Sequence, residues 1–277
     1  MTSTPASVPL WMSSGSAALP AEPLACIADG PIAHMVINRP AKRNAMTAEL
    51  WRLIRETVER LAADSAVRLV VVRGAGEAAF SGGADIEEFP RVFADAPSIR
   101  AYNELVRTAQ IALERLEKPT LAVIRGACVG GGCGVALSCD IRFAADTVRM
   151  GITPAKLGTV YSVPDTRRLV ALVGISRAKD ILFSGRLVDA AEALSLGMVN
   201  YVVPPAELDA RAAAYARLLL ANSRESISTT KAIVNAVAGI APADEAVLDA
   251  RFEASFASKD FRKGFAAFIA KRPPKYE

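Results

Sequence analysis

The first half of the chain alternates short apolar runs with stretches of helical spacing, a pattern that predicts strands and helices in turn. Residues 25–28 and 32–37 are two such apolar runs, and the Asp29-Gly30 pair between them is typical of a tight hairpin turn. Thr47 precedes leucine, isoleucine and valine residues at helical spacing, so we expect it to cap a helix. Further strands are expected at three later apolar runs, 68–73, 120–124 and 140–144. The alternation predicts an α/β fold with a mostly buried sheet.

The second half of the chain, from Pro164 onward, carries a nearly continuous helical pattern. The Pro204-Pro205 pair is its best internal boundary, because proline interrupts a regular element. We therefore divide the chain into an N-terminal segment, a core and a helical C-terminal region, 1–22, 23–204 and 205–277. The first of these is rich in serine, alanine and proline and is expected to be disordered.

Composition places the chain among ordinary globular proteins. Its 277 residues are 52% hydrophobic and 22% charged, which excludes a disordered or collagen-like chain. There are 33 Lys and Arg against 29 Asp and Glu, a net charge of +4, and the segment 259–277 carries six basic and two acidic residues. That segment is either a solvated helix face or a site for a phosphorylated ligand. No basic stripe with interleaved aromatic residues appears elsewhere, so we expect no nucleic-acid partner.

Cysteine and histidine usage removes several kinds of site. The four cysteines form no Cys-x-x-Cys pair, and the single histidine, His34, lies in an apolar run where packing in a sheet is expected. Zinc sites, disulfide frameworks and Ser-His-Asp or Cys-His catalysis are therefore not expected, unless His34 itself is the base. The first 21 residues lack the basic start and continuous apolar run of a signal peptide. We expect a cytoplasmic protein with no metal and no membrane partner.

Two glycine-rich loops carry the chemical interest. The first spans Phe80–Phe89 (FSGGADIEEF) and the second spans Gly126–Gly134 (GACVGGGCG), and each follows an apolar strand and opens a helix. Glycine lets a backbone turn sharply and approach a ligand, and a helix start exposes unpaired N–H groups. Neither loop has the spacing of a P-loop or of a dinucleotide-binding turn. They are either tight packing turns or, facing one another, a two-donor oxyanion hole.

Both loops belong to a set of ordered motifs that also includes 37–46 (INRPAKRNAM), 178–186 (AKDILFSGR), 190–200 (AAEALSLGMVN) and 264–272 (GFAAFIAKR). In these motifs and their spacing the chain, from Leu24 to its C-terminus, resembles the crotonase (enoyl-CoA hydratase/isomerase) superfamily. The resemblance implies a ββα spiral core with a helical C-terminal oligomerisation region, assembled as a homotrimer or homohexamer. It also implies an enzyme that stabilises the enolate of an acyl-CoA thioester, with coenzyme A as part of the substrate and no separate cofactor.

The resemblance gives roles to residues that match the family's motifs. The two oxyanion donors would be the N–H groups of Ala84 and Gly131. Gly82 would lie beside the adenine, and Phe252 and Lys271 would contact the nucleotide end of CoA, often from a neighbouring subunit. The residues expected to bind substrate or CoA are Arg43, Ala45, Gly82, Asp85, Ile86, Pro154, Ala155, Gly158, Phe252 and Lys271.

The chain departs from the family at the positions that hydratases use for acid–base chemistry. Gly134 and Ala155 stand where the family's hydratases have two glutamates, and neither has a titratable atom. Hydration by the usual route is therefore not expected, and the same holds for isomerases with one glutamate. Decarboxylation of a malonyl-type thioester needs no base, because loss of CO₂ leaves an enolate that the two N–H donors stabilise.

Tyr161 is the third catalytic candidate. Residues 152–161 (ITPAKLGTVY) resemble the methylmalonyl-CoA decarboxylase branch, in which a tyrosine stands six residues after the lost carboxylate. Tyr161 would hold the leaving carboxylate or donate a proton; alternatively it packs at the pocket edge. That branch has a histidine where this chain has Ala84, and the family's basic residue after Gly-Ala-Asp-Ile is Glu87 here.

Two other functions stay open at this point. A hydratase or isomerase with displaced acids would use Glu87, Glu88 or Asp165, which lie on or near the loops that border the acyl pocket. Asp165 alternatively caps a helix, and Glu88 alternatively stabilises the first turn of one. A protein that binds acyl-CoA without turnover is the third function class. Leu157 and Val160 suggest a wall of the acyl pocket but do not give its length.

Overall fold

The computed structural model describes residues 19–241 and 244–276, and these form two sheets. The larger sheet has the order β1-β2-β3-β5-β7-β10, in which β1 and β2 are antiparallel and the other pairs are parallel. The smaller sheet has the order β4-β6-β8-β9. The strands are β1 (Leu24–Asp29), β2 (Ile32–Ile37), β3 (Leu69–Gly74), β4 (Ala79–Ser81), β5 (Thr120–Ile124), β6 (Ala127–Val129), β7 (Ile141–Ala145), β8 (Arg149–Gly151), β9 (Leu187–Asp189) and β10 (Tyr201–Val203).

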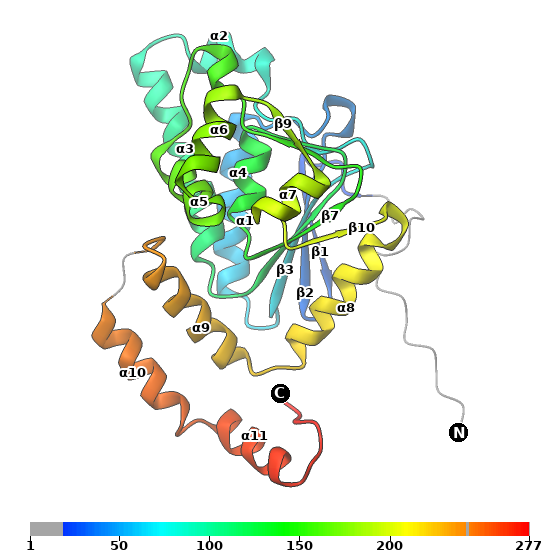
Figure 1. The fold of residues 1–277 in the computed structure, drawn as a ribbon, viewed down its shortest axis with the longest axis vertical. Coiled ribbons are helices and arrows are strands. Elements are labelled where there is room, and N and C mark those ends of the chain that lie inside the picture. The colour runs from blue at the N-terminus through cyan, green and yellow to red at the C-terminus, as the bar shows by residue number, and fades with distance from the viewer. Residues whose placement is uncertain (1–18, 242–243, 277) are drawn as a thin grey trace.

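Helices surround the sheets and dominate the chain after residue 163 (Figure 1). The helices are α1 (Ala48–Ala63), α2 (Phe89–Val92), α3 (Ala96–Arg115), α4 (Gly131–Leu137), α5 (Val163–Val173), α6 (Ile175–Ser184), α7 (Ala190–Leu196), α8 (Leu208–Leu220), α9 (Arg224–Val237), α10 (Glu245–Ser255) and α11 (Lys259–Ile269). Short 3-10 turns lie at η1 (Pro40–Lys42), η2 (Ile86–Glu88), η3 (Pro154–Leu157) and η4 (Pro205–Glu207). The helical pattern predicted from Pro164 onward is confirmed, apart from the short strands β9 and β10 within that segment.

The larger sheet is buried on both faces, because alternate side chains of its strands enter two separate cores. Val70 and Val72 of β3 pack in the core that contains residues of α1 and α3, whereas Leu69 and Val71 pack in the core beneath α8. A parallel sheet covered on both faces needs such continuous apolar strands. The α/β class expected from the sequence is therefore confirmed.

The local predictions for the N-terminal half are also confirmed. β1 and β2 pair across a turn at Asp29-Gly30. Thr47 accepts a hydrogen bond from Leu50 N at 3.1 Å and so caps α1. His34 is buried within β2, as expected for a packed side chain. The four strands of the smaller sheet and β10 of the larger sheet are absent from the predicted elements, because three residues are too few to show a period of two.

The C-terminal helices depart from the rest of the molecule. In Figure 1, α10 and α11 lie beyond α9 as an arm, away from α2 and α4. Phe252 is 53% exposed and Phe268 is 79% exposed, an apolar surface typical of helices that another protein chain covers. The homotrimer or homohexamer stays a prediction, as does the division into 1–22, 23–204 and 205–277.

The N-terminal segment predicted to be disordered lies, up to residue 18, outside the described residues. Its last residues are held against the larger sheet. Leu19 packs against a small apolar cluster on β1 and β2, and Asn38 Nδ2 donates to Pro20 O at 2.8 Å. In the described part of the chain, no helix has the length and apolar character that crossing a membrane requires.

Candidate active site

The two glycine loops leave neighbouring strands and face one another. β4 and β6 pair in parallel, so both loops start from the same edge of the smaller sheet. A Cβ on Gly83 would stand 3.1 Å from Val129 O, and a Cβ on Gly130 would stand 3.7 Å from the Cα of Gly83. Gly83 also has a φ of 99°, a conformation that favours glycine. The close approach of the loops therefore depends on Gly83.

The amides expected to act as donors lie one residue beyond these contacts. Met46 N donates to Gly83 O at 2.7 Å, and Asp85 N donates to Met46 O at 2.9 Å. This bridge leaves the N–H of Ala84 without a partner among the described residues. Gly131 is the first residue of α4, where backbone N–H groups have no partner within the helix. Both N–H groups are thus available to a ligand.

Charged side chains hold the first loop in place. Arg39 pairs with Asp85 at 2.8 Å, and this partner lowers the pKa of the Asp85 carboxyl. Glu87 forms an exposed ion pair with a lysine. Glu88, expected as an acid in the first turn of a helix, has Oε2 2.7 Å from Ala48 N and accepts its hydrogen bond at the start of α1. The acids of this loop are therefore engaged in structural contacts.

Three polar side-chain atoms converge on Gly134, one helical turn beyond Gly131 on α4. A Cβ at residue 134 would stand 2.3 Å from Gln110 Nε2, 3.1 Å from Asp165 Oδ1 and 3.2 Å from Tyr161 OH. A glutamate at this position would collide with Gln110. The glycine therefore leaves open the space that the side chain of Gln110 fills. Tyr161 and Asp165 bring titratable groups to the position where α4 has none.

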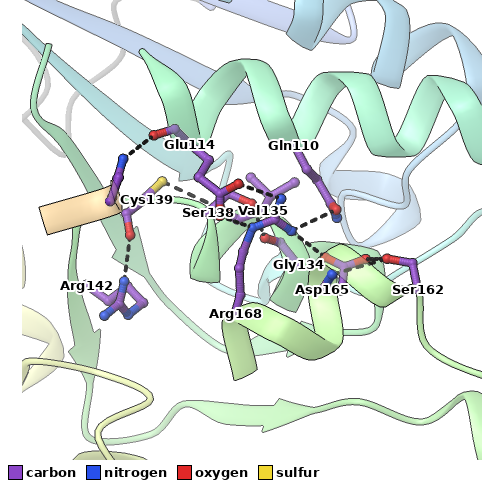
Figure 2. Close-up of polar contacts among 11 residues, drawn as sticks. Gln110, Glu114, Gly134, Val135, Ser138, Cys139, Arg142, Ser162, Asp165 and Arg168 are labelled. Carbon is purple, nitrogen blue, oxygen red and sulfur yellow. Dashed lines mark hydrogen bonds and ion pairs between the residues drawn. The ribbon is translucent and has the colours of Figure 1, made fainter. Parts of the chain in front are cut away.

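Arg168 of α5 links Asp165 to Gln110 and Glu114 of α3 (Figure 2). Its Nη1 donates to Asp165 Oδ1 at 2.8 Å and to Gln110 Oε1 at 3.2 Å. Its Nε donates to Glu114 Oε1 at 2.5 Å. None of these four residues is more than 9% exposed. Buried charges are tolerated here because each is paired and hydrogen-bonded.

Asp165 does not cap a helix, so that alternative expectation is wrong. Ser162 caps α5 instead: its Oγ accepts from Asp165 N at 3.2 Å and donates to Asp165 Oδ2 at 2.6 Å. Burial raises the pKa of Asp165, although Ser162 and Arg168 stabilise its charged form. Burial also raises the pKa of Tyr161 well above its usual value, so its phenol is protonated at neutral pH.

The remaining residues expected around CoA fall into two groups. The first group lies in or beside the first loop and consists of Arg43, Ala45, Gly82, Asp85 and Ile86. Pro154 and Ala155 of η3 and Gly158, which ends η3, belong to the same group. Phe252 on α10 and Lys271 just after α11 lie on the C-terminal arm, so a single chain does not bring them to the loops (Figure 1). Leu157 and Val160, expected in a pocket wall, are 67% and 86% exposed on this chain.

Sequence reasoning misses Gln110, Glu114 and Arg168. Gln110 and Glu114 lie four residues apart on α3, on the face that also carries the buried Ala109 and Leu113. Polar residues on the apolar face of a helix are unusual, and this signal in the sequence could have found them. Arg168 gives no comparable signal, because its helix contains a second arginine beside it.

Other chemistry is sparse around the site. Among residues 19–241 and 244–276, no three side chains that could hold a metal ion lie together. The cysteines are free thiols, and burial raises the pKa of Cys139 to about 12. A thiol with such a pKa is not a nucleophile at neutral pH.

Comparison with known proteins identifies the relatives of this fold and site. Residues 28–277 match the family model for enoyl-CoA hydratase/isomerase. The chain belongs to the enoyl-CoA hydratase/isomerase family. It is 34% identical over 247 residues to the short-chain-enoyl-CoA hydratase of Clostridium acetobutylicum, which covers 88% of this chain and 93% of that protein. It is 33% identical over 243 residues to the crotonyl-CoA hydratase of Syntrophomonas wolfei, covering 87% and 92% of the two chains.

Solved structures of the enoyl-CoA hydratase/isomerase family have the same fold. An enoyl-CoA hydratase/carnithine racemase from Magnetospirillum magneticum superimposes with a TM-score of 0.88 at 34% identity, covering 97% of this chain and 98% of that one. The crotonase-type core expected from the sequence is confirmed, and the protein is a crotonase-superfamily enzyme that acts on acyl-CoA. Its relatives are named hydratases, whereas this chain has Gly134 and Ala155 at the two positions noted above.

Proposed function

We propose that this family member decarboxylates a malonyl-type CoA thioester through an enolate that the N–H groups of Ala84 and Gly131 stabilise. The observation that carries the proposal is the environment of Gly134. No carboxylate extends from α4 there, and the phenol of Tyr161 and the amide of Gln110 bring hydrogen-bond donors instead. Decarboxylation suits such a site, because it needs donors for the thioester oxygen and the carboxylate but no general base.

The reaction balances with the substrate alone. The bond between the α-carbon and the carboxylate carbon breaks, its electron pair moves into the thioester as an enolate, and CO₂ leaves. The enolate oxygen then carries the charge that the two backbone N–H groups stabilise. Tyr161, whose buried phenol stays protonated, delivers a proton to the α-carbon and regains one from solvent.

A second function, hydration or isomerisation of an enoyl-CoA thioester, has one observation in its favour. Asp165 Oδ1 lies 3.1 Å from the Cβ position of residue 134, and burial raises the pKa of this carboxyl. Carboxyl groups with raised pKa values serve as catalytic acids and bases. Both oxygens of Asp165, however, already accept hydrogen bonds, from Arg168 and from Ser162. We therefore rank this function second.

The test compares the two reactions on the purified full chain. Incubation with methylmalonyl-CoA or ethylmalonyl-CoA should release CO₂, and Tyr161→Phe should slow this release. Tyr215→Phe, on α8 and outside the site, is the matched control and should keep the full rate. Hydration of crotonyl-CoA without CO₂ release would favour the second function. Tight binding of CoA thioesters without any turnover would favour a non-catalytic acyl-CoA-binding protein.

The proposed assembly is a homotrimer or homohexamer acting in the cytoplasm. Phe252 and Lys271 would then reach the nucleotide end of CoA bound to a neighbouring copy, and the basic residues of 259–277 would suit its phosphates. Sedimentation should give the mass of three or six chains. In that assembly Lys271→Glu should raise the KM for an acyl-CoA substrate with little change in kcat, and a monomer in solution would contradict the assembly.

A further inference from the structure

One hydrogen-bond donor beside Arg168, Gln110 Nε2, has no acceptor among the described residues. All four carboxylate oxygens of Glu114 and Asp165 accept from Arg168 or from a serine hydroxyl, at 2.5 to 3.2 Å. Gln110 Oε1 also accepts from Arg168, so its Nε2 points the other way, toward Gly134. Gln110 is 2% exposed, and its Nε2 has no partner among the described residues.

Tyr161 provides a second donor at the same place. Its phenol oxygen is buried and has no partner in the described part of the chain. The phenol oxygen lies 3.2 Å from the position that a Cβ on residue 134 would occupy. Gln110 Nε2 lies 2.3 Å from the same position. Buried polar groups are nearly always hydrogen-bonded, and here the carboxylate and amide oxygens have partners while Gln110 Nε2 and the Tyr161 hydroxyl have none. An acceptor oxygen of a ligand would satisfy both groups.

The two donors lie beside the proposed oxyanion site. Gly134 follows Gly131 by three residues on α4, which places it about 4.5 Å further along the helix axis and on the same face. An oxygen on the β-carbon of an acyl chain lies at a comparable separation from the thioester oxygen. A ligand whose thioester oxygen meets Gly131 can therefore bring a β-oxygen to Gln110 and Tyr161.

The charged cluster behind the donors limits the length of the acyl chain. An alkyl chain that continued past Gln110 would pack against Arg168, Glu114 and Asp165, all of them buried. Displacing the hydrogen bonds of buried charges by apolar groups is strongly unfavourable. This wall favours short acyl groups with a polar end over long fatty acyl chains.

We propose that Gln110 is the specificity-determining residue, and that with Tyr161 it binds an acceptor oxygen on the β-carbon of a short acyl group. The acceptor is a carboxylate oxygen in a malonyl-type thioester or a carbonyl oxygen in a 3-oxoacyl thioester. Arg168 is a positioning residue, because it fixes the amide so that Nε2 faces the ligand. The inference rests on the proposed binding of the thioester oxygen at Ala84 and Gly131.

The experiment measures dissociation constants of CoA thioesters by titration calorimetry, so that it does not depend on turnover. Acetoacetyl-CoA, which carries a β-carbonyl oxygen, should bind the wild type more tightly than butyryl-CoA, and octanoyl-CoA should bind more weakly than butyryl-CoA. Gln110→Met keeps the volume but removes the donor. It should weaken acetoacetyl-CoA binding by about five- to tenfold and leave butyryl-CoA within about twofold.

Two further variants separate the donor from the packing. Gln110→Glu keeps an acceptor for Arg168 but loses the donor and adds a charge. It should weaken methylmalonyl-CoA binding, measured as KM if the protein releases CO₂ from this compound and by calorimetry if it does not, more than acetoacetyl-CoA binding, because two carboxylates then repel one another. Thr108→Ala, a half-buried position on the same helix whose hydroxyl bonds only to the backbone of α3, is the control and should not change the ratio of acetoacetyl-CoA to butyryl-CoA affinity. A merely structural role of Gln110 would lower the melting temperature without changing the preference between ligands.

The outcomes distinguish this inference from the proposed reaction. An unchanged ratio of acetoacetyl-CoA to butyryl-CoA affinity in both Gln110 variants would overturn the inference, even if CO₂ release is robust. If the Gln110 variants lose the preference for acetoacetyl-CoA over butyryl-CoA and the wild type releases no CO₂, the inference is supported and decarboxylation is contradicted. Octanoyl-CoA binding as tight as that of acetoacetyl-CoA would show that the charged cluster does not limit the acyl chain.

Discussion

Gln110 Nε2 lies 2.3 Å from the position that a Cβ on Gly134 would occupy, so a residue of α3 fills the space that a side chain on α4 would need. Arg168 holds Gln110 through its Oε1, and the amide is therefore not free to swing aside. The glycine at 134 and the glutamine at 110 form a single structural feature. A glutamate cannot be restored at 134 while Gln110 keeps its position.

We expect Gly134→Ala to lower the free energy of unfolding by about 1–3 kcal/mol, because the added methyl group overlaps Gln110. Gln110→Ala removes the overlap, so the double variant should lose less stability than the two single variants together. Urea unfolding of the four proteins measures this coupling, which we expect to be about 1 kcal/mol or more. Additive free energies would show that the two residues do not compete for space.

Gly83→Ala should disturb the approach of the two loops. Its φ of 99° strains any other residue, and the new methyl group would press on Val129 O. We expect a loss of about 1–3 kcal/mol in stability and at least about tenfold weaker acetoacetyl-CoA binding, since the oxyanion donors move apart.

The control for this variant is Gly30→Ala in the hairpin turn. Gly30 also has a positive φ, 55°, but no heavy atom lies within 4 Å of its added Cβ, so the substitution adds strain alone. It should lower stability without changing ligand affinity. Equal ligand affinities for the two variants would show that Gly83 does not set the distance between the loops.

The larger sheet, apart from its three-residue strand β10, and the helices that cover it could be predicted because their signals are local. The hairpin at Asp29-Gly30, the cap at Thr47 and the apolar strand at 120–124 each depend on a few neighbouring residues. The smaller sheet could not be predicted in this way. Its three-residue strands form through pairing with distant segments, and β4 alone carries no period that distinguishes it from a loop.

The candidate site was predictable only in part, for a similar reason. The loops around Ala84 and Gly131 are visible as glycine runs, and Tyr161 follows from the resemblance. The cluster that surrounds Gly134 joins residues more than 50 positions apart, such as Arg168 and Gln110. A hydrophilic residue near a helix start fits both a cap and a buried ion pair, and only tertiary packing decides between them.

Arg168 should be among the most sensitive positions of the protein. Arg168→Met leaves Asp165 and Glu114 buried without their cation, which should cost about 3–5 kcal/mol in the free energy of unfolding. Arg107→Met breaks an exposed pair with Glu104 and is the matched control, with an expected cost below about 0.5 kcal/mol. Chemical denaturation of both variants measures the difference, and similar costs would show that the buried network adds nothing.

Stability should fall in mild acid because of the single histidine. Burial, with a smaller effect from Arg73, lowers the pKa of His34 from 6.5 to about 3. Below pH 6.5 the unfolded chain therefore binds a proton that the folded chain does not, so the stability present above pH 6.5 is lost progressively as the pH falls toward 3. Between pH 7 and pH 4.5 the histidine should account for about 2–3 kcal/mol. The variant His34→Val cannot take up this proton. Urea unfolding at the two pH values should therefore show that the variant loses less free energy of unfolding than the wild type, by that amount. Equal losses in the two proteins would contradict the role of His34.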